Sequence, residues 1–181
     1  MKMTRRGFTI VEMLAVIGVI AVLVSIIATV ASGSINSSRS KRAEVMRNAL
    51  EQAIAAYYAQ EGKWPSLIEA NVGTDGENTV KFTGSKADKI FQEVVGKGFG
   101  KGGGKSMLID ASALFVCDSG SAGHAKSRGY EFSEVMGKNA KHRIGLSQMA
   151  FGYPETKKGY FRRFMVIYNC RTDAVKVEKT D

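Results

Sequence analysis

The segment GFTIVE, residues 7–12, joins a short basic leader to an uncharged apolar run that extends from Met13 to Ala31. Three basic residues, Lys2, Arg5 and Arg6, precede this junction. A helix over the run would be about 28 Å long, which is close to the roughly 30 Å thickness of a bilayer core. The segment therefore predicts an apolar helix near the N-terminus that is directed to a membrane.

Three interpretations of this segment compete. The first is a plain transmembrane anchor, and the second is a cleaved secretory signal peptide, for which residues 31–33 offer small side chains. Neither accounts for Glu12, because a carboxylate at the edge of an apolar run is costly to place in lipid and therefore indicates a function. The run is also longer than the apolar core of a signal peptide, which is about 7 to 15 residues.

The third interpretation is a family resemblance. Gly7, Phe8, Thr9 and Glu12, followed by an apolar helix, resemble the type IV prepilin class, which includes type IV pilins and the pseudopilins of type II secretion. The resemblance implies a structural filament subunit rather than an enzyme. It also implies that a prepilin peptidase cleaves between Gly7 and Phe8 and N-methylates Phe8. Glu12 would then pair with the Phe8 amine of a neighbouring subunit.

The same resemblance implies the partners and the location of the protein. The partners would be other pilin or pseudopilin subunits in a homo- or hetero-oligomeric filament, the prepilin peptidase, an inner-membrane assembly platform and membrane lipid. The chain would cross the inner membrane once with its head in the periplasm, and then join an extracytoplasmic filament. Many members have a proline in the membrane half of the helix, whereas the first proline here is Pro65.

A long helix is expected before Pro65. Residues 1–7 would be the leader, 8–34 the membrane half of the helix, 35–62 its amphipathic half and 63–181 a globular head. Apolar residues recur in the amphipathic half at spacings of three and four, namely Met46, Ala49, Leu50, Ala53, Ile54 and Tyr57. Arg47 and Glu51 are four residues apart and can pair on the polar face. The helix exit at 57–65 resembles that of major pseudopilins, which favours type II secretion over a pilus.

The head is expected to contain a short helix and several strands. The helix is predicted at 86–95, and strands are predicted at 113–117, 161–168 and 174–178. Residues 66–85 are polar and contain glycine, residues 71–76 within them and residues 96–104 are interpreted as loops, and residues 130–136 are ambiguous. The overall prediction is an α+β fold in which a long N-terminal helix packs on a small antiparallel sheet.

The charge of the chain leaves two further functions open. The net charge is +9 over 181 residues, and this mild basic excess is typical of a solvated surface. A minor type IV pilin that binds DNA or surfaces through basic loops is one alternative, so nucleic acid stays open as a partner. A signal-anchored exported enzyme is the other, and paired titratable groups in a pocket would favour it.

Other motifs point to no cofactor. Gly104-Lys105-Ser106 fails the phosphate-loop pattern, because Phe99 occupies the position of its first glycine. His124 and His142 lack metal-ligand spacing, so both are expected at the surface. Lysines interleave with the acidic residues Asp173, Glu178 and Asp181 and glycine-rich turns are missing there, so calcium is disfavoured.

Two cysteines, Cys117 and Cys170, both end predicted strands. Export would favour a disulfide between them, and the alternative is two buried free thiols. A bond would stabilise the fold by about 4 kcal/mol in the entropic model.

Overall fold

The computed structural model describes residues 9–73, 78–98, 109, 114–123, 127–136, 140, 142–155 and 160–180, without the side chains of 28–36, 97 and 98. Gly7, Phe8, His124, Asp181 and the segment 104–106 lie outside the described residues. The chain divides into two compact units, Met1–Ser38 and Arg39–Asp181.

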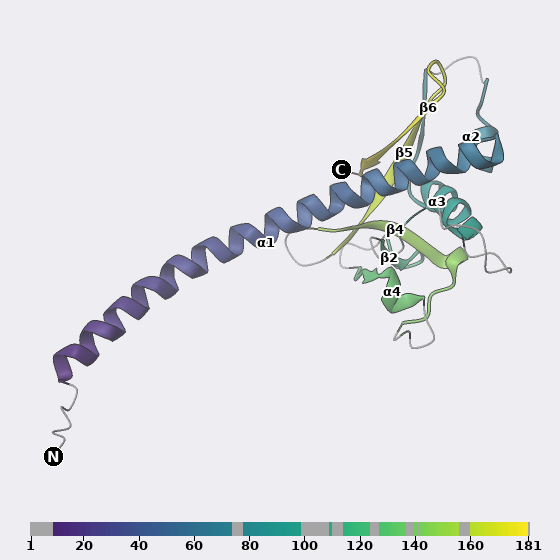
Figure 1. Ribbon diagram of the computed structural model, residues 1–181. Helices are drawn as coiled ribbons and strands as arrows, with labels where there is room; N and C mark the ends of the chain where they lie inside the picture. The colour runs from purple at the N-terminus through teal and green to yellow at the C-terminus, as the bar shows by residue number, and fades with distance from the viewer. Residues whose placement is uncertain are drawn as a thin grey trace, which may run out of the picture. The chain divides into compact units, whose positions relative to one another are not determined.

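Helix α1 extends from Ile10 to Glu61 and comprises 52 residues (Figure 1). Within the first unit it contains no proline or charge after Glu12. The hydroxyl of Ser25 is satisfied within the helix, since its Oγ donates to Val22 O at 2.7 Å. Its apolar side chains from Ile10 to Ile27 are exposed. Among the described residues, Ile10–Ile27 is the one stretch of helix that is long and apolar enough to cross a membrane.

The second part of α1 lies in the other unit and buries one face in its core. The buried residues are Ala43, Met46, Leu50, Ala53, Ile54 and Tyr57, while Ala49 is partly buried against the same cluster. The predicted amphipathic pattern is confirmed. The predicted pair of Arg47 with Glu51 is wrong: Arg47 donates to Asn48 Oδ1, and Glu51 accepts the Val177 amide instead.

Gly62 ends α1 as predicted. It has a φ of 68°, a left-handed conformation that glycine adopts without a steric penalty, and its amide donates to Tyr58 O at 2.9 Å. Pro65 then precedes the short helix α2, Ser66–Glu69, which sequence analysis missed.

The head contains one six-stranded antiparallel sheet. The strands are β1 Thr79–Phe82, β2 Phe115–Asp118, β3 Tyr130–Glu131, β4 Met149–Pro154, β5 Phe161–Asn169 and β6 Ala174–Lys179. Their order is β1-β5-β4-β2-β3, and β6 also pairs with β5. The remaining elements are the helices α3 Ser85–Gly98 and α4 Phe132–Val135 and the 3-10 helix η2 Leu146–Gln148.

The predicted α+β fold is confirmed, and α3, β2, β5 and β6 lie close to their predicted positions. Strand β1 lies in the polar segment 66–85 and was not predicted; it pairs with β5 through Val80 and Tyr168 and through Phe82 and Val166. The ambiguous segment 130–136 divides between β3 and α4.

The apolar face of α3 packs into the same core as α1. Ala87, Ile90, Phe91, Val94 and Val95 are buried along it, and the ring of Phe91 meets Phe151 of β4 edge-on at 5.9 Å. Phe164, Val166 and Tyr168 contribute alternate side chains from β5, as expected for a strand with one buried face. This core fixes α3 against β4 and β5.

Candidate functional site

The N-terminal end of α1 is closed by a reciprocal set of hydrogen bonds between Thr9 and Glu12. The amide and the Oγ1 of Thr9 both donate to Glu12 Oε2, at 2.8 and 2.9 Å. In return, the Glu12 amide donates to Thr9 Oγ1 at 3.3 Å. This is a capping box, in which a threonine N-cap and a glutamate three residues later satisfy amides that the first helical turn leaves unpaired.

Sequence analysis named Thr9 as part of the motif but did not recognise its role as a helix cap. The signal was present, because Thr-x-x-Glu before an apolar run is the sequence pattern of a capping box. Both bonds from Thr9 go to Oε2, and no described residue donates to Oε1. The capping box thus holds the carboxylate at the helix start and leaves one oxygen accessible.

A shallow groove of about 380 Å³ lies on the surface of the same apolar helix. It is lined by Ala15, Gly18, Val19, Val22 and Leu23. A side chain added at Gly18 would meet no atom of the described structure within 4 Å. Small residues on an apolar helix allow another helix to approach closely.

The structure does not bring the two cysteines together. Both are free thiols, so the expected disulfide between Cys117 and Cys170 is not present in the structure. Cys117 pairs in register with Ala150 of β4 and belongs to a small cluster with Phe161, whereas the Cys170 amide donates to Asn78 O beside β1. Burial raises the pKa of the Cys117 thiol, and the neighbouring Asp118 carboxylate raises it further.

Two of the acidic residues considered for calcium, Asp173 and Glu178, have protein partners. Asp173 Oδ1 accepts hydrogen bonds from Trp64 Nε1 and Tyr168 OH, and Glu178 forms an ion pair with Lys176 at 2.6 Å. Within the described part of the chain, no group of three or more histidine, cysteine, aspartate or glutamate residues could hold a metal ion. His142 is exposed, as predicted, and its ring lies 4.2 Å from that of Tyr130.

Two carboxylates organise the exit of α1. Glu93 of α3 accepts from Tyr57 OH at 2.8 Å and from the amide and hydroxyl of Ser66. Burial raises the pKa of Tyr57 to about 12, and the bond to Glu93 adds to the shift. Burial also raises the pKa of Tyr168 to about 12, with a further contribution from its bond to Asp173. The aromatic exit is thereby tied both to α3 and to the β5–β6 turn.

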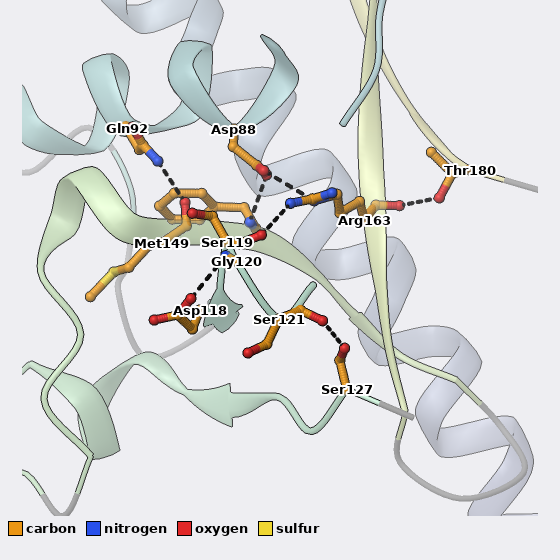
Figure 2. A network of polar contacts seen from close by, with 11 residues as sticks. Asp88, Gln92, Asp118, Ser119, Gly120, Ser121, Ser127, Met149, Arg163 and Thr180 are labelled. Carbon is orange, nitrogen blue, oxygen red and sulfur yellow. Dashed lines mark hydrogen bonds and ion pairs between the residues drawn. The ribbon is translucent and has the colours of Figure 1, made fainter. Parts of the chain in front are cut away.

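A second polar network, which sequence analysis missed, joins α3 to three strands (Figure 2). Asp88 Oδ2 lies 3.0 Å from Arg163 Nε, and Asp88 Oδ1 accepts the Phe151 amide at 3.2 Å. Arg163 also donates from Nη2 to Ser119 O at 3.0 Å. Only 2% of the Asp88 side chain and 17% of the Arg163 side chain are exposed, so this is a buried ion pair.

Burial raises the pKa of Asp88 to about 6, although Arg163 and the Phe151 amide act against the shift. Desolvation therefore exceeds the stabilisation that the pair provides. The network fixes the start of α3 on β4 and β5, and it resembles a structural support rather than a reactive site.

The comparisons with known proteins address the N-terminal segment. Residues 2–28 match a family model described as the prokaryotic N-terminal methylation motif. No curated protein and no solved structure matches the chain significantly. The matched region contains Gly7, Phe8, Thr9 and Glu12 and most of the apolar run, and its apolar helix favours membrane anchoring.

This motif indicates a precursor like those of type IV pilins and pseudopilins, and it points to a structural subunit. It also implies processing by a prepilin peptidase and assembly with other pilin subunits. The chain carries, at residues 2–28, the N-terminal signature of the type IV prepilin class.

Proposed function

We propose that this protein is a filament subunit of a type II secretion pseudopilus, processed between Gly7 and Phe8 and assembled from the inner membrane. The observation that carries the proposal is the methylation motif at 2–28 together with the single charge, Glu12, within Ile10–Ile27. The helix exit with Tyr57, Tyr58 and Trp64 supports a pseudopilus over a pilus, because it resembles that of major pseudopilins.

The capping box gives Glu12 a defined role in this proposal. Thr9 occupies Oε2 and leaves Oε1 accessible, so the N-methylated Phe8 amine of a neighbouring subunit can approach a carboxylate that is already oriented. Pairing of opposite charges relieves the cost of a carboxylate in lipid. Each incoming subunit would be registered by this contact, since one axial offset places the amine against Oε1.

The groove around Gly18 supports the same assembly. Subunits that are anchored by parallel apolar helices can pack closely where side chains are small, and the groove lies along the helix that carries Glu12. The proposed partners are copies of this chain, other pseudopilins, the prepilin peptidase, an inner-membrane assembly platform and lipid. The head would lie in the periplasm.

The test compares three substitutions at one position. Glu12→Gln and Glu12→Leu remove the charge, and the matched control Glu12→Asp keeps it. In cells that express the whole secretion system, we expect normal membrane insertion and normal cleavage for all three variants. Filament yield should fall for Gln and Leu and be partly retained for Asp, because the neighbour's amine needs an anionic partner.

Two results would contradict the proposal. Normal filaments with Glu12→Gln and Glu12→Leu would show that the charge does not guide assembly. A mature N-terminus at Ser34 or at Met1 would instead support a signal peptide or a plain anchor.

A further inference from the structure

A cavity of about 320 Å³ opens beside the end of β5, away from the N-terminal helix. It is lined by Phe161–Arg163 of β5, by Thr180 after β6, by Gly84 before α3, and by Ala122 and Gly123. Its volume is ample for a tetrahedral ion with its hydration, and three of its walls carry small or no side chains. Arg163 of this lining also belongs to the buried network with Asp88, which Figure 2 shows.

Arg163 turns one nitrogen toward this cavity. Its Nε faces Asp88 and its Nη2 donates to Ser119 O, but no described residue accepts a hydrogen bond from its Nη1. A Cβ added at Gly84 would lie 3.9 Å from Nη1, so this nitrogen faces the glycine wall. The absence of a side chain at Gly84 therefore keeps a guanidinium donor accessible from the cavity.

The charges of the lining favour an anion. Arg162 and Arg163 are two cationic residues of the lining, and none of the described lining residues is acidic. Their counter-charges lie outside the lining: Asp88 on the Nε side of Arg163, and Glu155, whose Oε1 is 3.1 Å from Arg162 Nη2. Guanidinium groups present planar sets of donors that suit phosphate, sulfate and carboxylate oxygens.

The position of Arg163 is fixed before any ligand binds. The ion pair with Asp88 orients its side chain, while Thr180 donates its amide and Oγ1 to Arg163 O, with the hydroxyl bond at 2.7 Å. A donor held in this way loses little conformational entropy on binding. Carbonyl and carboxylate groups occupy its other nitrogens, so Nη1 is the part of the guanidinium that is left for a ligand.

We propose that this cavity binds a small tetrahedral oxyanion of the sulfate or phosphate class, with Arg163 Nη1 as the principal donor and Arg162 as the second cation. The site lies within the head and does not depend on filament assembly or on Glu12. The phosphate could be free in the periplasm or part of a lipid headgroup, and the two sources share the same chemistry.

The test is a titration of the full chain in neutral detergent micelles, followed by NMR of backbone amides and of arginine Nε–H groups. Sodium sulfate is exchanged for sodium chloride at constant ionic strength. We expect saturable shifts at Gly84, Gly123 and Arg163 in the millimolar range. Inorganic phosphate should displace sulfate, and phosphatidylglycerol in the micelles should compete only if a headgroup can enter the cavity.

Two variants and one control make the test specific. Arg162→Gln should weaken sulfate binding about tenfold through the loss of one charged donor. Gly123→Leu should abolish it by filling the cavity, since a Cβ at Gly123 would meet no described atom within 4 Å. Arg143→Gln, an exposed arginine outside the lining, should leave the affinity unchanged.

The proposal is overturned if sulfate produces no saturable shift in the wild-type protein. It is also overturned if Gly123→Leu and Arg162→Gln bind sulfate as tightly as Arg143→Gln does, because the shifts would then arise elsewhere on the basic surface.

Discussion

The indole Nε1 of Trp64 donates to Asp173 Oδ1 at 2.7 Å, although 109 residues separate the two in sequence. Tyr168 OH donates to the same oxygen at 2.8 Å. Asp173 is also the one described residue other than glycine with a positive φ, 48°. A single carboxylate oxygen therefore joins the exit of α1 to the turn between β5 and β6.

This relationship predicts different effects for two substitutions. Asp173→Asn keeps a side-chain oxygen and a residue type that tolerates a positive φ, so it should be mildly destabilising. Asp173→Ala loses both bonds and strains the turn, and should cost about 2 to 3 kcal/mol of unfolding free energy. Trp64 is the only tryptophan, so its fluorescence can follow denaturation of the full chain in detergent. Equal losses for Asn and Ala would contradict the role of the shared oxygen.

The buried carboxyl of Asp88 predicts a pH dependence of stability. Its pKa is about 6 in the folded protein against an ordinary value of 3.8, so between these pH values the folded state binds a proton that the unfolded state releases. This contribution is fully present below pH 3.8 and is lost as the pH rises through 6, by up to about 3 kcal/mol.

Asp88→Asn removes this titration. The neutral amide resembles the protonated carboxyl, so the stability of the variant should stay nearly constant while the wild type loses stability relative to it as the pH rises from 4 to 6. The measurement is the unfolding free energy of both proteins across this range. If the unfolding free energies of the two proteins changed with pH in parallel, the pKa of Asp88 in the folded state would be close to its ordinary value.

The close packing around Gly152 of β4 should exclude any other residue at this position. A Cβ there would collide with the carbonyl oxygen of Arg162 on the paired strand and with the ring of Phe161. Gly152→Ala should therefore destabilise the protein by about 3 kcal/mol or more, because backbone atoms must separate. Gly145→Ala is the matched control, since its nearest contact would be the flexible end of Gln148 at 3.7 Å. Similar melting temperatures for both variants would contradict this close approach of β4 to β5.

The two free thiols should differ in reactivity. Cys117 is 1% exposed and burial raises its pKa, so it should react with a thiol reagent only after unfolding. Cys170 is partly exposed and should react slowly in the folded protein. Labelling of periplasmically produced protein, followed by mass spectrometry, checks both sites. Recovery of a disulfide-linked peptide that contains Cys117 and Cys170 would show that the two residues form a bond in the exported protein.

The processing motif predicts the mass of the mature protein. Removal of residues 1–7 and one methyl group on the amine of Phe8 should be found in intact-mass and peptide spectra of protein from cells with the prepilin peptidase. Gly7→Val should leave the leader attached, because the proposed cleavage directly follows this glycine. Loss of the leader in a strain without that peptidase would point to a different protease.

The sequence predicted the elements whose side-chain periodicity is long enough to be unambiguous. The core face of α1 repeats from Met46 to Tyr57, and that of α3 from Ile90 to Val95, so both helices were identified. Strand β1 was missed, because four residues with one buried side chain, Phe82, carry too little pattern. Its pairing with β5 decides its structure, and that contact is remote in sequence.

The polar sites divide in the same way. The pair of Thr9 and Glu12 is local and could be recognised from its spacing in the sequence. Asp88 and Arg163, in contrast, meet only after α3 has packed on the sheet. The cysteines show most clearly which contacts a local sequence pattern cannot predict. Both lie at strand ends as predicted, but the strand order places Cys117 beside β4 and Cys170 beside β1, and no local pattern encodes that order.

The bond between Glu51 and Val177 has a consequence for how subunits can associate. In the described part of the sheet β6 pairs only with β5, so its outer edge could accept a foreign strand. Glu51 Oε2 instead receives the Val177 amide at 3.0 Å from the side of α1. Glu51 of the long helix thus occupies one amide donor of β6, which leaves that donor unavailable to a foreign strand. For the filament subunit proposed above, this contact would let precursors accumulate at high local density without strand pairing between their heads.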